Sequence, residues 1–396
     1  MNRLDSNTYG ELFSAALGGE NWQHFVDRYN EKYDYDTVPD FVFAPTSISY
    51  TFQQLVESAG AKTLPAYVDV DSPGYLAALS DLKGVTGNIP TQKKFYRLDR
   101  RVVLEKLQLI ERYGLDAMDK SMRDAFLSLL DESTDGLIAS FYNALAYQRN
   151  QIVSKHEFVI DTPNNPRGLH GITIKFGVPS ANTDTLSGTS RWWTDADHST
   201  EGTASDPLDY LKKRVKWIRR DGHYTGALRM EVSQDLWDDM TGHSKVLKAV
   251  GLRLYPGAAS DAIATSLAKN ADDDAVKEAI RKIIRVDSIV IRDTYAFIDK
   301  PGTDSDGNPD LVTERIEAFD GKTVAFVPEG GLGDIQGVEP ITLGYDDDKV
   351  AGFEGNRLKL SQYAEPRTHS LYIESEAAQI CVPNKPNYMF RSVVTA

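Results

Sequence analysis

Cysteine is almost missing from this chain, which holds a single one, Cys381, in 396 residues. One thiol excludes an intrachain disulfide and any metal site built from several thiolates. The seven histidines show none of the HxH, HxxxH or HExxH spacings that zinc sites use. Stability therefore has to come from packing and from partners.

Long apolar runs are missing too. No stretch approaches the roughly 18 to 20 consecutive apolar residues that a membrane-spanning helix needs. The apolar patch at Leu12–Leu17 is short and lies between Glu11 and Glu20, unlike a secretory signal peptide. The overall composition, 41% hydrophobic and 26% charged, is that of a globular protein. We expect no membrane partner and no secretion by that route.

An excess of positive charge is the third absence. The chain has 44 basic and 58 acidic residues, a net charge of −14, which repels nucleic acid at long range. One segment departs from this balance, with six basic residues in nine positions: Lys212, Lys213, Arg214, Lys216, Arg219 and Arg220. Such a helix could contact phosphate, but a solvated face or ion pairs with an acidic neighbour explain it more simply.

Catalytic motifs are absent as well. No G-x-S-x-G elbow marks a nucleophilic serine. The glycine-rich stretch at Glu329–Gly333 lacks the Lys-Ser/Thr ending of a phosphate loop, and His198 beside Asp195 and Asp197 fits a polar loop. We therefore predict a protein that is not an enzyme and takes no cofactor.

One candidate metal site stands out, where oxygen ligands alternate at Asp304, Asp306, Asn308 and Asp310. Gly307 is out of step with a calcium-binding EF-hand loop, and a proline intrudes. Because extended segments flank this stretch, Asp-Gly at 306–307 favours a hairpin turn over a metal site.

Apolar periodicity predicts most elements. An uncharged helical stripe marks 131–154, where short polar residues precede the helix and Arg149 lies near its end. Separate helices are expected at 100–113, 118–130, 207–220, after Ser233, and once or twice within 261–285. Strands are expected at 158–160, 172–176, 228–232, 250–254, 288–298, 311–319 and 323–327. Helices and strands interleave without a regular βαβ repeat, which predicts an α+β fold.

Residues 62–96 predict a long hairpin, because two extended limbs flank an irregular, turn-rich middle. An isolated two-stranded ribbon is only marginally stable in water. The hairpin therefore lies either on a neighbouring subunit or back on its own domain, and the pattern leaves both open.

A family resemblance rests on motifs that follow one another in order. They are AYVDVDSP (66–73), NIPTQKKFY (88–96), NALAYQR (143–149), GITIKFGVP (171–179), MEVSQDLWDDM (230–240), VAFVPEGGLGDIQG (324–337) and ICVPNKPNYMFRSVV (380–394). In this order the chain resembles the major capsid proteins of tailed bacteriophages, in particular the lambda-type capsid protein E group, which adopt the Hong Kong 97-like fold.

The resemblance implies a layout. It gives an N-terminal arm (1–61), an extended E-loop (62–97), a peripheral P-domain (98–204) with its spine helix at 131–154, an axial A-domain (205–339) and strands that return to the P-domain (340–396). A scaffolding domain fused ahead of the arm is not expected.

The implied function is mechanical: copies of the chain would form pentamers and hexamers of an icosahedral capsid, assembled in the bacterial host cytoplasm, that encloses double-stranded DNA. Scaffold, portal and decoration proteins would be further partners. Candidate interface residues are Tyr67, Asp69, Lys83, Lys93, Lys94, Lys212, Arg214 and Arg219. Two alternatives remain open: a hydrolase or calcium-dependent binding enzyme that uses loops 179–205 and 303–310, and a capsid-associated accessory protein.

Overall fold

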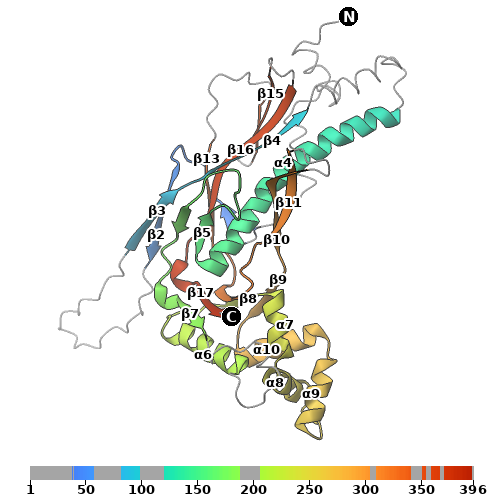
Figure 1. The fold of residues 1–396 in the computed structure, drawn as a ribbon. Helices are drawn as coiled ribbons and strands as arrows, with labels where there is room; N and C mark the ends of the chain where they lie inside the picture. Colours follow the sequence, from blue (N-terminus) through green and yellow to red (C-terminus); the bar gives the residue numbers. More distant parts are fainter. Residues whose placement is uncertain are drawn as a thin grey trace, which may run out of the picture. The chain divides into compact units, whose positions relative to one another are not determined.

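The computed structural model describes residues 38, 40–57, 82–98, 120–187, 206–303, 309–339, 350–353, 358–365 and 370–394 (Figure 1). The chain divides into two compact units, each built from three separate stretches. Unit 1 holds Met1–Phe52, Asn88–Ala146 and Asp334–Cys381, and unit 2 holds Gln53–Gly87, Tyr147–Gly333 and Val382–Ala396. We describe each unit by itself.

Unit 1 is built on a sheet in the order β1-β13-β16-β15-β14, with β4 also paired to β16. Their bounds are β1 Phe41–Phe43, β4 Thr91–Leu98, β13 Gly333–Val338, β14 Val350–Phe353, β15 Leu358–Glu365 and β16 Ser370–Pro383. Strand β4 runs antiparallel to β16 from Thr91 to Leu98, opposite Ala378 to Leu371. Ala377, Ile380 and Cys381 on β16 are buried, so the inner half of this strand forms part of the unit's core.

One long helix, α4 (Lys120–Lys155, 36 residues), replaces the two helices expected at 118–130 and 131–154. It runs unbroken through the polar segment 131–135, where the sequence pattern predicted the start of a separate helix. Helix propensity and capping preference are weak signals that tertiary context overrides. The predicted stripe is confirmed further along, where Leu137, Phe141 and Leu145 are buried in unit 1.

Unit 2 contains a five-stranded sheet in the order β7-β17-β12-β8-β9. The strands are β7 Thr183–Leu186, β8 Leu228–Ser233, β9 Ser288–Arg292, β12 Thr323–Pro328 and β17 Phe390–Val394. The central strands β8 and β12 are buried along their whole length. Short 3-10 turns flank the sheet at Ser180–Asn182 and Pro386–Tyr388.

Strand β17 belongs to a different sheet from the other strands of residues 340–396. Strands β14, β15 and most of β16 belong to the sheet of unit 1, whereas β17 pairs antiparallel with β12 and parallel with β7 in unit 2. The end of the chain therefore joins the sheet of unit 2, where β7 lies in the segment expected as the P-domain and β12 in the segment expected as the A-domain.

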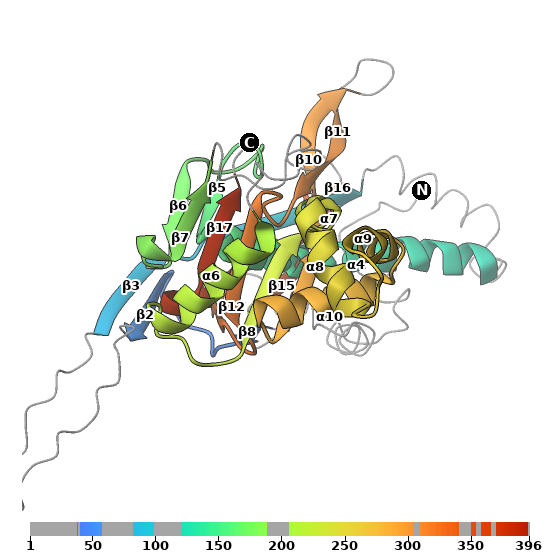
Figure 2. The same ribbon diagram turned by 90° about the horizontal axis from the view of Figure 1, so that it is seen from below.

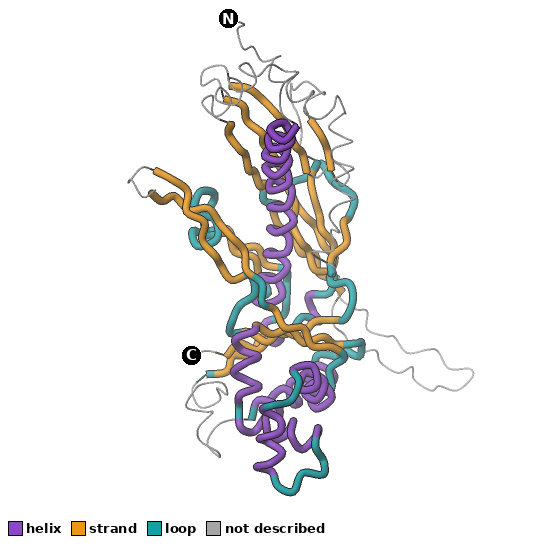
Figure 3. Tube along the Cα trace, turned by 90° about the vertical axis from the view of Figure 1, so that its right-hand side faces the viewer, coloured by secondary structure: helices purple, strands orange, loops and turns teal. Residues whose placement is uncertain are grey.

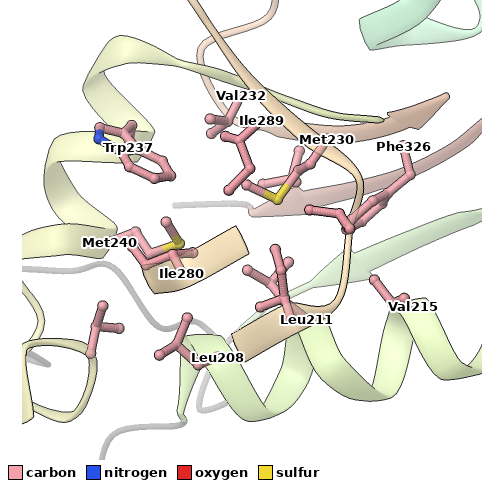
Figure 4. Close-up of a cluster of buried hydrophobic side chains, with 14 of the residues drawn as sticks. Leu208, Leu211, Val215, Met230, Val232, Trp237, Met240, Ile280, Ile289 and Phe326 are labelled. Atoms are coloured by element: carbon pink, nitrogen blue, oxygen red, sulfur yellow. The ribbon is translucent and has the colours of Figure 1, made fainter. Parts of the chain in front are cut away.

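A layer of helices covers one face of the five-stranded sheet (Figure 3). Leu211 and Val215 of one helix pack on Met230 and Phe326 of the sheet in the buried cluster of Figure 4. The helices are α6 Pro207–Arg220, α7 Gln234–Gly242, α8 Ser244–Leu254, α9 Asp261–Lys269 and α10 Asp273–Ile284. The predicted start of α6 is confirmed, because the Asp206 carboxylate accepts hydrogen bonds from the backbone N–H groups of Leu208 and Asp209.

The strand expected at 250–254 is wrong, since these residues end helix α8. The apolar run there resembles a short buried strand, and such runs cannot be assigned by periodicity alone. Val246 and Val250, four residues apart, are both buried, so the helical spacing is visible only when the window starts earlier.

Three pairs of strands form sheets of only two strands. They are β2 (Thr51–Glu57) with β3 (Leu82–Asn88), β5 (Glu157–Ile160) with β6 (Ile172–Lys175), and β10 (Tyr295–Thr303) with β11 (Pro309–Glu317). In the first pair, β2 lies within the segment expected as the arm and β3 within the expected E-loop, whereas β4, also in the expected E-loop, pairs with β16 of unit 1. Residues 58–81 lie outside the described part of the chain.

None of the described helices combines the length and the apolar character that a membrane crossing requires.

Candidate assembly surfaces

A buried cluster of charged side chains in unit 2 surrounds Glu231 of β8, on the sheet face opposite the helical layer. This carboxylate is fully buried and accepts hydrogen bonds from three guanidinium groups: two from Arg149 of α4, and one each from the Nε atoms of Arg229 and Arg292 at 2.9 Å. Arg149 and Glu231 are 82 residues apart in the sequence. The cluster therefore fixes the end of α4 to the centre of the sheet.

Electrostatics keeps this carboxylate charged. Burial alone would raise the pKa of Glu231, but the charges and hydrogen bonds of Arg149 and Arg292 outweigh it and hold the pKa far below its ordinary value. Nearby, the Gln151 amide donates to the Ala318 carbonyl at 2.7 Å and the Asn150 amide donates to Thr294 Oγ1 at 3.0 Å. These contacts make the end of α4 a rigid anchor.

A second polar network lies where α4 ends. His156 takes a left-handed conformation (φ 62°) directly after the helix, and its Nδ1 lies 3.4 Å from Thr183 Oγ1. Arg391 of β17 donates to Thr183 Oγ1 and to the Ser154 carbonyl, both at 3.2 Å. Burial, with the charges of Arg391 and Arg214, lowers the pKa of His156 to about 3. This histidine is therefore neutral in the folded protein.

Arg214, one of the predicted interface residues, belongs to the same interior. Its side chain is 8% exposed, donates to the Asn182 carbonyl at 2.7 Å and lies over the Trp217 ring at 4.4 Å. On the same helix, the Tyr210 hydroxyl donates to Asp184 of β7 at 2.6 Å. Arg214 thus holds α6 to the β7 side of the sheet.

The outer face of α6 remains basic. Lys213 pairs with Asp209 at 2.6 Å, and Arg219 with Asp287 at 3.5 Å. Lys212 and Lys216 are exposed, and the structure shows no carboxylate paired with either among the residues that it describes. Of the three α6 residues predicted to form an interface, Lys212 is the one whose charge stays available to a partner.

The β10–β11 hairpin of unit 2 exposes several apolar side chains. Its strands pair antiparallel from Tyr295 opposite Glu317 to Thr303 opposite Pro309. Phe297 is 71% exposed, and Leu311 and Val312 are half exposed. Apart from the ion pair between Lys300 and Glu314, most of its surface faces solvent.

The pairing up to Thr303 and Pro309 confirms the prediction of a hairpin around the candidate metal site. Asp304, Asp306 and Asn308 lie outside the described residues, and the side chain of Asp310 does too. Within the described part of the chain no group of three or more acidic, histidine or cysteine side chains could hold a metal ion.

Strand β4 carries two predicted interface lysines in unit 1. Lys93 lies opposite Glu376 of β16, with its Nζ 3.0 Å from that carboxylate and 3.9 Å from Glu374. Lys94 lies 5.8 Å from the centre of the Tyr96 ring. Both are thus engaged with their own unit. Tyr67 and Asp69 lie outside the described residues, and so does the side chain of Lys83 on β3.

A small cavity opens at the base of the hairpin, beside Arg292. Its volume is about 20 Å³, room for roughly one water molecule. Ser233, Gln234, Asp235, Asp293, Thr294, Tyr295, Glu317, Phe319 and Gly321 complete its lining. The cavity is too small for an organic substrate. Of the loops proposed for a hydrolase, residues 188–205 and 304–308 lie outside the described residues, so no observation favours that alternative.

Sequence reasoning missed both the Glu231 cluster and the exposed Phe297. The cluster joins residues of α4, β8 and β9 that no local motif connects. Phe297 alternates with other apolar residues as in a half-buried strand. Only the structure shows that no third strand, among the residues that it describes, covers this face.

Comparison with known proteins yields structural neighbours. No protein-family model matches the chain, and no curated protein matches it either. Among solved structures, the putative capsid protein of an E. coli CFT073 prophage shows 10% identity and a TM-score of 0.47 over 100% of both chains. The mature capsid of bacteriophage PhiM1 shows 11% identity and a TM-score of 0.45, over 92% of this chain and 88% of that one. The satellite phage P4 procapsid shows 10% identity and a TM-score of 0.44, over 94% and 99%. With so few shared residues, the role of each side chain has to be argued from this chain.

Proposed function

We propose that this chain is the repeating subunit of an icosahedral bacteriophage capsid. The observation that carries the proposal is the order of its elements, which supports the layout that the sequence resemblance implies. A two-stranded hairpin base comes first, then the long helix α4, then a unit of sheet and helices, then strands that return to the sheet of unit 1.

The distribution of rigidity supports this role. The end of α4 is anchored by Glu231 and by the network around His156, so the sheet of unit 2 and the helix end move as one body. By contrast, β2–β3 and β10–β11 are two-stranded sheets, and β10–β11 leaves four large hydrophobic side chains exposed, so contacts within its own chain stabilise it only weakly. Rigid bodies with projecting hairpins suit a subunit that binds its copies.

The main partner is therefore a second copy of the chain. Contacts between different surfaces of identical subunits close into rings when the rotation permits, which gives pentamers and hexamers. Individual contacts can be weak, because many of them act together in a closed shell. We place the protein in the virion capsid, assembled in the host cytoplasm.

Other partners belong to the same proposal. The net charge of −14 disfavours tight adhesion to packaged double-stranded DNA, so we propose non-specific contact only. Scaffold, portal and decoration proteins are the further partners that a capsid subunit of this kind would have. Tyr67, Asp69 and Lys83 of the hairpin segment stay proposed contact residues, as do Lys93 and Lys94 of β4.

Electron microscopy and light scattering of the purified protein test the proposal, with and without a co-expressed scaffolding protein. Shells, rings or sheets with five-fold or six-fold units are the expected result. A compact monomer under every condition, including with scaffold, would overturn it. Calorimetry with calcium checks the alternative, since a calcium-dependent enzyme would have to bind the ion.

A further inference from the structure

Uncovered apolar surface in the described residues gathers on the β10–β11 hairpin. Of the twelve large hydrophobic side chains that are exposed, four lie here: Tyr295, Phe297, Leu311 and Val312. Phe297 and Leu311 point to one face of the hairpin, because residues at odd positions of both strands share that face in the observed register. Arg315 covers the Tyr295 ring at 3.8 Å, which leaves Phe297 as the largest open side chain.

The hairpin is also acidic. Between residues 295 and 317 the sequence holds six acidic and two basic residues, a net charge of −4. The occupant of this surface should therefore combine cations with aliphatic stems that can lie on a phenylalanine ring. Nucleic acid and acidic protein surfaces are disfavoured for the same reason.

Helix α6 offers the complementary surface. Its fourteen residues carry six basic and one acidic side chain. Lys212, Lys216 and Arg220 follow one another at four-residue intervals, about 6 Å apart along the face that points away from the sheet. The only carboxylate paired with any of the three, among the described residues, is that of Asp221 on Arg220, and both side chains are exposed.

The two surfaces lie at opposite edges of one sheet. Helix α6 is tied to the β7–β17 edge, because Tyr210 contacts Asp184 and Ser392. The hairpin follows β9, the strand at the other edge. Figure 2 shows β10 and β11 leading away from α6. Contact between them therefore requires two molecules.

We propose that the β10–β11 hairpin of one copy docks on helix α6 of a second copy, through Phe297 and its acidic neighbours on one side and Lys212, Lys216 and Arg220 on the other. The contact joins different surfaces, so each copy uses its hairpin toward one neighbour and its helix toward the next. This inference deepens the proposed capsid function by naming one subunit contact.

Cysteine cross-linking tests the contact directly, since the native Cys381 is fully buried. Thr313 lies on the same face as Phe297, and Lys216 is at the centre of the α6 stripe. The double variant Thr313→Cys/Lys216→Cys, oxidised with copper phenanthroline, should give a ladder of covalent oligomers on a non-reducing gel. Each single variant should give at most dimers. The matched control is Thr313→Cys/Lys269→Cys, because Lys269 is an exposed lysine on α9 in the same unit.

A ladder that is as strong with Lys269→Cys as with Lys216→Cys would overturn the proposal. So would assembled particles of the Thr313→Cys/Lys216→Cys variant that give no ladder. The cross-linking result can be interpreted whether or not the protein forms shells. An unassembled protein that still gives the specific ladder would keep this contact and remove the capsid function, whereas shells without the ladder would do the reverse.

Charge reversal supplies a second readout. Lys212→Glu/Lys216→Glu should lower the assembled fraction at fixed concentration by at least about tenfold, since like charges then face each other. Asp299→Lys/Glu317→Lys, at two acidic residues on the same face as Phe297, should do the same, and the combined quadruple variant should recover most of the loss. Circular dichroism checks that each variant is folded. A quadruple variant no better than either double variant contradicts the proposed pairing.

Discussion

Strands β12 and β10 lie close together in the sequence, but β12 is buried in the fold and β10 is exposed or half-buried along its length. Both carry a phenylalanine among apolar neighbours, yet Phe326 on β12 is fully buried and Phe297 on β10 is 71% exposed. Strand β12 has a strand on each side and a helical layer on one face, whereas β10 pairs with β11 alone within the described part of the chain. The same side chain therefore stabilises the fold in one strand and is left available for a partner in the other.

Replacing each of the two phenylalanines by alanine should separate the stabilising role of Phe326 from the binding role of Phe297. Phe326→Ala should lower the free energy of unfolding by about 3–5 kcal/mol, because it leaves a cavity in the packed core. Phe297→Ala should change it by less than about 0.5 kcal/mol, as expected for an exposed position, while it weakens assembly. Urea unfolding followed by circular dichroism measures both. Equal losses of stability would show that the hairpin belongs to the core after all.

Two glutamates, one in the buried cluster and one on the exposed hairpin, allow the same comparison for ion pairs. Glu231→Gln should cost about 3 kcal/mol or more, because it leaves buried arginines without their counter-charge. Glu314→Gln, which breaks only the partly exposed pair with Lys300, should cost no more than about 1 kcal/mol. The urea midpoints of the two variants decide the matter. A Glu231→Gln protein as stable as the Glu314→Gln protein would mean that α4 is not anchored through this cluster.

Acid should lower the free energy of unfolding through the buried His156. Its pKa is lowered from 6.5 to about 3 in the fold, so the unfolded chain binds a proton at a pH where the folded protein does not. Stability is therefore complete above about pH 6.5 and declines as the pH falls toward 3, by up to about 1.4 kcal/mol per pH unit from this group. His156→Asn suits the left-handed conformation and should flatten the decline between pH 6 and 4. Urea unfolding at both pH values measures the slope, and an unchanged slope in the variant would contradict the assignment.

The elements of the buried region were largely predictable from the sequence. The α+β class, the start of α6 at Asp206 and the helix after Ser233 were predicted and are confirmed, because each depends on local signals such as caps and apolar spacing. The failures are cases in which distant contacts decide. Helix α4 runs through a polar segment that resembles a cap, and residues 250–254 continue a helix.

The candidate surfaces were less predictable. Six basic residues in a row of nine predicted a charged helix, but not that Arg214 turns inward to Asn182 while Lys212 faces out. That division depends on where β7 lies, and the strand order is a long-range property. Likewise, the apolar residues of β10 signal a strand, but whether a third strand covers them is decided by the partners of the sheet.

Two glycines offer the smallest and most closely matched test. A Cβ added at Gly251 of α8 would lie 2.3 Å from the backbone carbonyl oxygen of Ala264, and one added at Gly302 of β10 would lie 2.3 Å from a methyl group of Val312. The first neighbour is the backbone of a packed helix, whereas the second is a half-exposed side chain that can rotate away. Gly251→Ala should therefore cost about 1–3 kcal/mol through overpacking, and Gly302→Ala less than about 1 kcal/mol. Thermal and urea unfolding compare them. If Gly302→Ala lowered the free energy of unfolding as much as Gly251→Ala, β10–β11 would be tightly packed within its own chain. The exposure of Phe297 would then be no sign that the hairpin is free to bind a partner.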